Sequence, residues 1–429
     1  MKRLPTALLL ATFVATPATS TAFPAPAPSA FTNSTNPASS TPAPTAPNTD
    51  DCPHSLLPPE PETTSEQLRP GQTSPAPLPP VRTADCGVSA PEGFRVDESV
   101  VGAAWIITDI DTGEIIAWKD PHGRYRPASI IKALLALVAI RDLDPALVIT
   151  ATREDAAMEG SAVGLGEGGH YSVTQLLQGL ILASGNDAAH ALATALGGEE
   201  TTLTKINALA TELGTTDTYA ASYSGLDAAG MSTSAYDMAL IYQAAFNNPV
   251  FAEIAATEHV DFPGYGDLEG YEVWNDNGLF MNDPDGIGGK TGFTDDAHHT
   301  FVGALNRDGR RLMAVILDTV VEGGHRSWQQ AQALLHEAYA VPPGGGIGSL
   351  EPVAHSSSSP TPLPSPTPMQ QESQQPVKTA PAQPDESYEW VGWVIISLTA
   401  ALVVALTTFS LRPRRRQSGR GHRANRSRY

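Results

Sequence analysis

Cysteine and basic residues are both scarce in this 429-residue sequence. Only two cysteines occur, Cys52 and Cys86, and their spacing does not match a metal-binding motif. Ten of the 26 basic residues lie at the chain ends, namely Lys2, Arg3 and eight arginines after position 411. The other 16 are set against 46 acidic residues, so the body of the chain has a net charge of −30. This excludes a basic patch for nucleic acid.

Two long stretches have few apolar residues and are rich in Pro, Ala, Ser and Thr. They cover Phe23–Ala84 and Pro342–Ser387. Because neither has enough apolar surface to offset the entropy of ordering, both are predicted to be extended, mobile linkers. The roughly 245 residues from about Asp97 to Ala340 are enough for one large domain, or for a main lobe with a helical insert.

Both ends of the chain carry membrane-targeting patterns. Met1–Ala22 combines a positive start, a short apolar run and a small-residue cleavage site, which is typical of a secretory signal. Trp390–Leu411 has no charged residue over a length that can span ~30 Å of hydrocarbon, and eight arginines follow it. The positive-inside rule predicts a single-pass cell-membrane protein with a cytoplasmic tail and everything before Trp390 outside the cell.

Outside the membrane, Cys52 and Cys86 are expected to form a disulfide that closes a loop of about 35 residues. In the chain-entropy model this bond adds roughly 3–4 kcal/mol of stability. The sequence therefore divides into a signal peptide (1–22), a Pro/Ala/Ser-rich N-terminal segment with its disulfide clasp (23–96), a folded domain (97–341), a Pro/Ser/Gln-rich linker (342–389), a transmembrane helix (390–411) and a basic tail (412–429).

The folded domain has strand patterns near both ends and helix patterns between them. Val100–Trp118 predicts two strands joined by a turn at Asp111–Gly113, and residues 299–319 predict two more joined at Asp308–Gly309. There is no βαβ alternation and no internal repeat, so we expect an α+β fold, an antiparallel sheet covered by helices with a helical subdomain. Helices are expected over Ser172–Leu196, Glu199–Leu213, Asp237–Phe246 and Ser327–Tyr339.

A first chemical motif is the S-x-x-K sequence formed by Ser129 and Lys132. It lies at the start of a predicted helix, where residues i and i+3 share a face and the amine can meet the hydroxyl. Serine needs an adjacent base, and lysine can serve if burial or nearby positive charge favours its neutral form. The motif alone is weak, although no other lysine here follows a serine by three positions.

Two further motifs follow in a fixed order. Ser184 and Asn186 form S-x-N about 50 residues later, and Lys290-Thr291-Gly292 forms K-T-G on a predicted edge strand about 100 residues beyond that. Lysine and threonine there offer a cation and a hydroxyl to a carboxylate, and Gly292 lets a substrate backbone approach closely. Each motif is common by itself, but this order points to one kind of acyl-transfer site.

With these motifs the sequence resembles low-molecular-mass penicillin-binding proteins, the serine-type D-alanyl-D-alanine carboxypeptidases, over about residues 97–340. Gly225–Ile241 and the Asn275–Asn277 neighbourhood are also similar to that family. The resemblance implies a penicillin-binding-protein or β-lactamase-like transpeptidase fold, with peptidoglycan stem peptides as substrates and β-lactams as inhibitors. No cofactor and no metal are expected. The β-rich second domain of some relatives is missing from the pattern.

The resemblance also implies residue roles. Ser129 would attack the carbonyl between two terminal D-alanines while Lys132 takes its proton, Ser184 would relay a proton to the leaving D-alanine, and Asn186 would hold base and substrate. Lys290 and Thr291 would recognise the carboxylate. Backbone N–H groups of Ser129 and Phe293 would form the oxyanion hole, although Phe293 replaces a small or polar residue. Arg326 falls where relatives carry a carboxylate-ordering arginine.

Four other interpretations of these residues compete with this one. A class A β-lactamase needs a deacylating glutamate and usually S-D-N, whereas this chain has Ser-Gly-Asn and no glutamate between Glu212 and Glu253. A DD-endopeptidase would use the same residues on crosslinks, and a wall-associated scaffold would not need an intact Ser129/Lys132 pair. A metal site at His298 and His299 is disfavoured because adjacent residues of a strand face opposite ways.

Overall fold

The computed structural model describes residues 44–68, 71, 73, 75–81, 86–321 and 325–351. The predicted signal peptide, transmembrane helix and basic tail lie outside these ranges. Within them, no helix has both the length and the apolar character needed to cross a membrane.

The described residues contain one large antiparallel sheet of seven strands. Its order is β1-β3-β2-β10-β9-β8, and β11 also pairs with β3. Both predicted hairpins are confirmed, and they lie side by side because β2 pairs with β10. The strands are β1 (Val88–Ser89), β2 (Ala104–Asp109), β3 (Glu114–Lys119), β8 (Gly286–Thr294), β9 (His298–Arg307), β10 (Arg310–Thr319) and β11 (Gly348–Ser349).

Alternate residues of the central strands enter two separate cores. On β2, Trp105 and Ile107 pack on one face while Ala104 and Ile106 pack on the other. This two-residue period is what a sheet covered on both faces requires. Helix α9 (Ser327–Ala338) covers the first face, and α6 (Ala235–Asn247) packs with the second.

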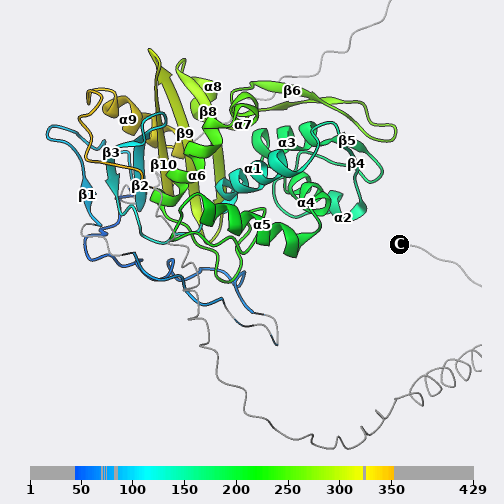
Figure 1. Ribbon diagram of the computed structural model, residues 1–429, viewed down its shortest axis with the longest axis horizontal. Coiled ribbons are helices and arrows are strands. Elements are labelled where there is room, and N and C mark those ends of the chain that lie inside the picture. The colour runs from blue at the N-terminus through cyan, green and yellow to red at the C-terminus, as the bar shows by residue number, and fades with distance from the viewer. Residues whose placement is uncertain are drawn as a thin grey trace, which may run out of the picture. The chain divides into compact units, whose positions relative to one another are not determined.

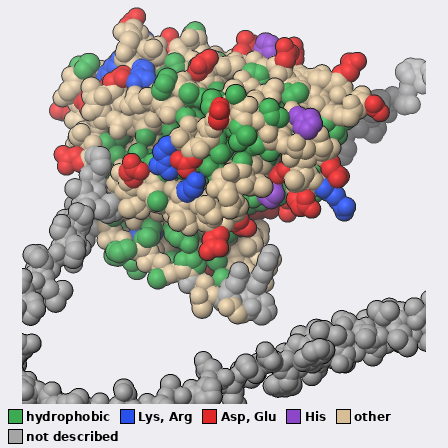
Figure 2. All heavy atoms as spheres, turned by 45° about the vertical axis from the view of Figure 1, so that its right-hand side comes forward, with side chains coloured by type: hydrophobic (Ala, Val, Ile, Leu, Met, Phe, Trp, Pro, Cys, Tyr) green, Lys and Arg blue, Asp and Glu red, His purple; other side chains and the backbone are tan. Residues whose placement is uncertain are grey.

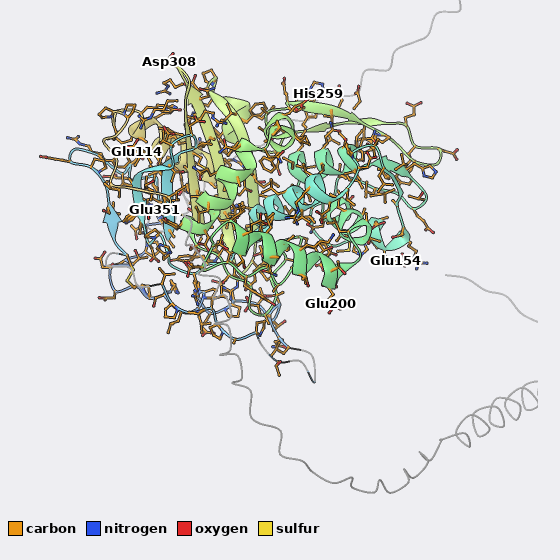
Figure 3. All side chains as sticks on the ribbon, in the orientation of Figure 1. Glu114, Glu154, Glu200, His259, Asp308 and Glu351 are labelled. Atoms are coloured by element: carbon orange, nitrogen blue, oxygen red, sulfur yellow. A yellow bond between two sulfur atoms is a disulfide. The ribbon has the colours of Figure 1, made fainter. Side chains whose placement is uncertain are left out.

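The helical part lies beside the sheet, on the right in Figure 1. Its central helix, α1 (Lys132–Asp142), is buried from Lys132 to Ala139, as expected for a helix that is apolar on every side. In Figure 3, Asp308 marks the β9–β10 turn and Glu154 marks α2, toward opposite ends of the domain. The surrounding elements are β4 (Val148–Thr150), α2 (Arg153–Ala156), β5 (His170–Ser172), α3 (Val173–Leu182), α4 (Asn186–Ala195), α5 (Glu199–Glu212), α7 (Pro249–Ala255), β6 (His259–Phe262) and β7 (Tyr271–Trp274). The short helix α8 (Gly278–Asn282) packs instead against β8, β9 and α9.

The single helix predicted over Ser172–Leu196 is wrong. The chain leaves the helix after Leu182 and starts α4 at Asn186, and Ser184 between them has a φ of 58°. A left-handed residue cannot continue an α-helix, so the break puts Ser184 and Asn186 at the end of one helix and the start of another.

The predicted domain limits are too narrow. Before residue 97, β1 pairs with β3, and after residue 341, β11 pairs with the same strand. Leu350 is buried, and Tyr236 accepts a hydrogen bond from the backbone N–H of Glu351. The sheet therefore includes one strand from the N-terminal segment (23–96) and another from the segment predicted to be a linker (342–389).

The prediction that Phe23–Ala84 is a mobile linker is also wrong for its described part. Residues 44–68, 71, 73 and 75–81, which we call the N-terminal strap, run along the lower edge of the domain as the blue trace in Figure 1. The backbone of this strap bonds to the domain, because Arg124 N donates to His54 O and Lys119 Nζ donates to Pro47 O. These contacts offset the ordering entropy that its composition could not.

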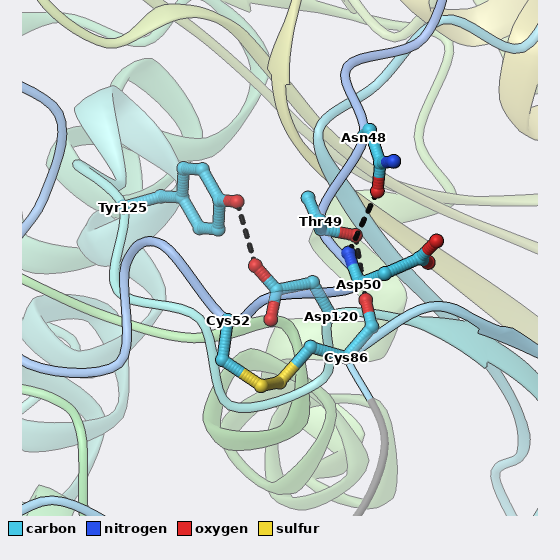
Figure 4. The surroundings of a disulfide bond; sticks show 7 residues. All are labelled: Asn48, Thr49, Asp50, Cys52, Cys86, Asp120 and Tyr125. Carbon is cyan, nitrogen blue, oxygen red and sulfur yellow. Dashed lines mark hydrogen bonds between the residues drawn. A yellow bond between two sulfur atoms is a disulfide. The ribbon is translucent and has the colours of Figure 1, made fainter.

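Cys52 and Cys86 form a disulfide that closes the strap (Figure 4). Around it, Thr49 Oγ1 donates to Cys86 O at 2.6 Å, and Tyr125 donates to the Asp120 carboxylate at 2.7 Å. The disulfide therefore ties the start of the strap to the segment that enters β1.

Replacing both cysteines by serine is expected to lower the free energy of unfolding by roughly 3 kcal/mol, because the unfolded chain regains the freedom of a long loop. Urea unfolding of the oxidised protein and of the C52S/C86S variant measures the difference. Reducing the wild-type protein should reproduce the loss, and adding reductant to the variant should change nothing. Equal midpoints for oxidised protein and variant would contradict this role.

Candidate active site

The nucleophile candidate Ser129 lies in a tight 3₁₀ turn, Ala128–Ile131, that leads directly into α1. The helix itself begins at Lys132, three residues later than the S-x-x-K pattern suggested. Ala128 has a φ of 47°, which is unfavourable for a residue with a Cβ and marks a backbone held by its surroundings. Thr300 Oγ1 and Tyr242 provide part of that hold by donating to Pro127 O and Ile130 O.

Lys132 is the centre of a compact polar cluster. Its Nζ lies 2.8 Å from Ser129 Oγ, 2.7 Å from Asn186 Oδ1 and 3.4 Å from Ser184 Oγ. The side chain is only 1% exposed. Asn186 is fixed in turn, because its Nδ2 donates to Glu159 O at 2.6 Å. The helix break after α3 thus brings the S-x-N pair against the S-x-x-K pair.

The K-T-G segment lies on β8, the edge strand, as predicted. Lys290 is 2% exposed and lies 3.6 Å from the Asp276 carboxylate, which also accepts a hydrogen bond from Thr291 Oγ1 at 2.8 Å. Gly292 faces the nucleophile turn: a Cβ there would lie 2.2 Å from Thr300 Oγ1 and 3.0 Å from Ser129 N. The glycine therefore permits close packing of β8 against the nucleophile turn.

Most predicted site residues line one cleft of about 420 Å³, with Lys132 and Lys290 buried beside it. Phe293 is 55% exposed there, and the centroid of its ring lies 4.7 Å from the centroid of the His299 ring. Arg326 is exposed on the cleft wall, immediately before α9. The site residues lining the cleft are Ser129, Ser184, Asn186, Thr291, Gly292, Phe293 and Arg326.

The charges around Lys132 favour its neutral form. Burial, and then the neighbouring Lys290 ammonium, hold the pKa of Lys132 well below its ordinary value, although Asp276 and Asp187 act in the opposite direction. Burial likewise lowers the pKa of Lys290, while Asp276 opposes that effect. A neutral amine 2.8 Å from a serine hydroxyl can accept its proton, so the cluster has the geometry and the electrostatics of an activated nucleophile.

Comparison with known proteins agrees with this geometry. Residues 91–320 match the sequence profile of the D-alanyl-D-alanine carboxypeptidase family. The chain belongs to this family. It is 44% identical over 249 residues to the D-alanyl-D-alanine carboxypeptidase DacB2 of Mycobacterium tuberculosis, which covers 57% of this chain and 85% of that protein. The chain is therefore a serine peptidase.

Solved structures give the same assignment. The crystal structure of a D-alanyl-D-alanine carboxypeptidase from Mycobacterium tuberculosis matches with a TM-score of 0.58 at 41% identity, over 61% of this chain and all of that one. A mutant of a Streptomyces DD-transpeptidase matches with a TM-score of 0.53 at 24% identity, over 56% of this chain and 98% of that one. The second likeness concerns the fold, which is the predicted penicillin-binding type.

Two acidic residues of this carboxypeptidase site, Asp276 and Asp187, lie outside the three sequence motifs. Asp276 contacts both Lys290 and Thr291, and its only signal was membership of the Asn275–Asn277 segment. Asp187 directly follows the S-x-N motif, is 1% exposed, and accepts hydrogen bonds from the N–H groups of Val163, Gly164 and Leu165. It therefore fixes the loop whose Glu159 carbonyl holds Asn186.

The histidine pair does not form a metal cluster within the described residues. His298 contacts Asp318 at 2.6 Å and Glu62 at 3.6 Å, whereas His299 lines the cleft. His298 lies at the start of β9 and has a φ of 52°.

The pH dependence of acylation should report the charges on Lys290 and Asp276. If neutral Lys132 is the proton acceptor, the rate rises as pH increases through its pKa. Lys290→Gln removes a positive neighbour, so the pKa of Lys132 and the rising limb should move to higher pH; Asp276→Asn should move them to lower pH. The measurement is the rate of labelling by a fluorescent penicillin against pH. Coincident profiles for all three proteins would contradict this electrostatic account.

Proposed function

We propose that this carboxypeptidase removes the terminal D-alanine from peptidoglycan stem pentapeptides through an acyl-enzyme on Ser129. The observation that carries the proposal is the contact of one buried amine, Lys132 Nζ, with Ser129 Oγ, Asn186 Oδ1 and Ser184 Oγ at the floor of the cleft. That arrangement suits acyl transfer with proton relay better than any other chemistry these residues offer.

In the first step, Ser129 Oγ attacks the carbonyl carbon of the penultimate D-alanine, and its proton passes to neutral Lys132. The tetrahedral oxyanion is stabilised by the backbone N–H groups of Ser129 and Phe293. The C–N bond then breaks, and the leaving amine takes a proton relayed from Lys132 by Ser184. The products of this step are free D-alanine and an ester on Ser129.

In the second step, water attacks the ester, and Lys132 accepts one of its protons and passes that proton to Ser129 Oγ as the ester C–O bond breaks. The shortened peptide leaves as a carboxylic acid, which loses its proton to solvent. A β-lactam would follow the first step alone: Ser129 opens the ring, no fragment departs, and the whole drug stays attached. Slow attack of water on that adduct makes the drug an inhibitor.

The substrate would be oriented by binding of its terminal carboxylate to the cationic side of the cleft. The terminal carboxylate of the stem peptide would lie against Thr291 Oγ1 and the Lys290 ammonium, with exposed Arg326 at the same wall. A carboxylate there is favoured because Lys290 is buried, where opposite charges attract more strongly than in water. Asp276 would have to yield some of its contact with Thr291 as the substrate binds.

Incubating the full chain with a stem pentapeptide ending in D-Ala-D-Ala, beside Ser129→Ala, tests the activity. We expect release of D-alanine that is lost in the variant. Cleavage of crosslinked stem dimers without D-alanine release would mean an endopeptidase, and rapid turnover of penicillin would mean a β-lactamase. Labelling by penicillin with no cleavage of either peptide would point to a scaffold. No labelling and no cleavage would refute an acyl-enzyme.

We further propose that the enzyme is exported and anchored by Trp390–Leu411, so that the domain acts on the wall side of the cell membrane. The support is in the sequence: an uncharged run of spanning length followed by eight arginines, and a secretory pattern at Met1–Ala22. The substrate class agrees with this location, because stem peptides lie outside the membrane.

Ending the chain before Trp390 is expected to release the enzyme from the membrane fraction while its labelling by penicillin persists. Cells that produce the full or the shortened chain are fractionated, and the enzyme in each fraction is detected by labelling with a fluorescent penicillin. A shortened chain that still sediments with membranes would contradict anchoring by this segment.

A further inference from the structure

The N-terminal strap binds the segment that leads to the nucleophile through two buried arginines. Arg124 is 1% exposed; its Nη1 donates to Leu56 O and Leu78 O, and its Nη2 donates to Pro79 O, all at 2.7–2.8 Å. Arg126 is 3% exposed, and its Nη1 donates to Pro59 O at 2.7 Å while its Nε donates to Glu66. Strap carbonyls and a strap carboxylate thus bind both guanidinium groups.

The same strap also binds the turn between β8 and β9. The Asp296 carboxylate, on a residue that is 7% exposed, accepts hydrogen bonds from Thr63 N at 2.8 Å, from Thr63 Oγ1 at 2.7 Å and from Ser65 Oγ. Burial alone would raise the pKa of Asp296, but these hydrogen bonds and the nearby Arg126 hold it below its ordinary value. Asp296 therefore stays ionised and keeps its strap partners at neutral pH.

In the sequence, these two anchor points lie equally far from the two residues whose N–H groups would form the oxyanion hole. Arg126 lies three residues before Ser129, and Asp296 lies three residues after Phe293. Between them, Thr300 Oγ1 donates to Pro127 O, and Gly292 packs closely against Ser129 N. Within the strap stretch Thr63–Glu66, Thr63 and Ser65 therefore bind the segment that carries Phe293, through Asp296. Glu66 binds the segment that carries Ser129, through Arg126.

We propose that Thr63–Glu66 is a clasp that sets the spacing of the two oxyanion donors, with Arg126 and Asp296 as positioning residues for the reaction. The inference rests on the proposed function, since it needs an oxyanion between Ser129 N and Phe293 N. Such donors act only when they are fixed in place, and a displacement of about 1 Å can cost on the order of 100-fold in rate. A clasp that touches both arms acts on the distance between them.

The test uses two exposed strap hydroxyls, whose loss is a small perturbation of folding. The double variant is the full chain with Thr63→Val and Ser65→Ala. These substitutions remove two of the three hydrogen bonds to Asp296 and keep the one from Thr63 N. The control is Thr49→Val, which removes another strap hydrogen bond, to Cys86 O. Because Thr49 is buried, this change perturbs folding at least as strongly as the double variant does, without touching Asp296. Thr63→Ser, which keeps a hydroxyl, is the rescue variant.

The measurement is the rate of labelling by a fluorescent penicillin over a range of concentrations, with thermal unfolding of each variant alongside. We expect the maximal rate of the double variant to fall at least about fivefold at an unchanged half-saturating concentration, because the oxyanion forms only in the transition state. Thr49→Val and Thr63→Ser should keep wild-type rates. Combining the double variant with Asp296→Asn should add little, because both changes break the same contact.

A double variant that labels at the wild-type maximal rate would contradict the proposed clasp. So would a loss of rate in Thr49→Val as large as the loss in the double variant, because that result would mean general destabilisation. Neither outcome would contradict the proposal that the reaction passes through an acyl-enzyme on Ser129. Failure of the wild-type chain to label at all is a different result, and it would refute the proposed function together with the clasp.

Discussion

Lys132→Arg is expected to lower the rate of acylation by penicillin and by stem pentapeptide by about 10³-fold or more. Arginine keeps its proton at every pH that the protein survives, so it cannot accept the proton of Ser129. The larger guanidinium must also enter a site where the lysine side chain is already 1% exposed and has three oxygen partners.

Lys205→Arg is the matched control, since Lys205 is partly exposed and pairs with Asp142 away from the cleft. This variant should label at the wild-type rate. Rates are measured by stopped reactions with fluorescent penicillin, and circular dichroism checks that both variants are folded. Retention of more than about a tenth of the rate by folded Lys132→Arg would show that Lys132 is not the proton acceptor.

Gly225→Ala is expected to destabilise the protein by at least about 2 kcal/mol and to abolish labelling in whatever fraction remains folded. Gly225 has a φ of +87°, and a Cβ there would lie 2.1 Å from Ala128 O and 2.9 Å from Ser129 N. Both contacts are to backbone of the nucleophile turn, which already holds Ala128 in a left-handed conformation. The turn must move, and Ser129 moves with it.

Gly168→Ala distinguishes the cost of a left-handed backbone conformation from the cost of a steric clash. Gly168 has a similar φ of +80°, but a Cβ there meets nothing within 4 Å. It should cost about 1 kcal/mol, from the conformational preference alone, and leave labelling unchanged. Thermal unfolding and penicillin labelling of both variants provide the comparison. If Gly225→Ala is no worse than Gly168→Ala, the packing of Gly225 against the nucleophile turn does not matter.

The strand pairs and the order of the three motifs could be predicted because their signals are local. Alternating apolar residues around Asp308–Gly309 specify a hairpin, and the position of K-T-G just before that hairpin places it on the neighbouring edge strand. The S-x-x-K spacing fixes two side chains on one turn of chain, whatever surrounds them.

The rest depends on contacts between distant residues. The break at Ser184 has no proline and needs a left-handed serine, which only the packed domain can impose. Asp276 acquires a role only when β7 brings it beside Lys290. The order of the strap could not be predicted, because composition reports only the apolar surface of a segment. This segment is held by arginine and aspartate partners elsewhere in the chain.

The distribution of charge on the surface agrees with the excess of acidic residues in the composition. On the face shown in Figure 2, acidic side chains are spread widely and basic ones lie at a few separate points. Lys290 is buried beside the cleft, so its positive charge lies where a substrate carboxylate would enter.

Mass spectrometry of the intact protein and of its peptides after brief exposure to penicillin tests the central claim most directly. The account predicts one added mass equal to the whole drug, carried by the peptide that contains Ser129 and absent from Ser129→Ala. An adduct on any other residue, or an unmodified Ser129 in protein that has been shown to be folded, would contradict it.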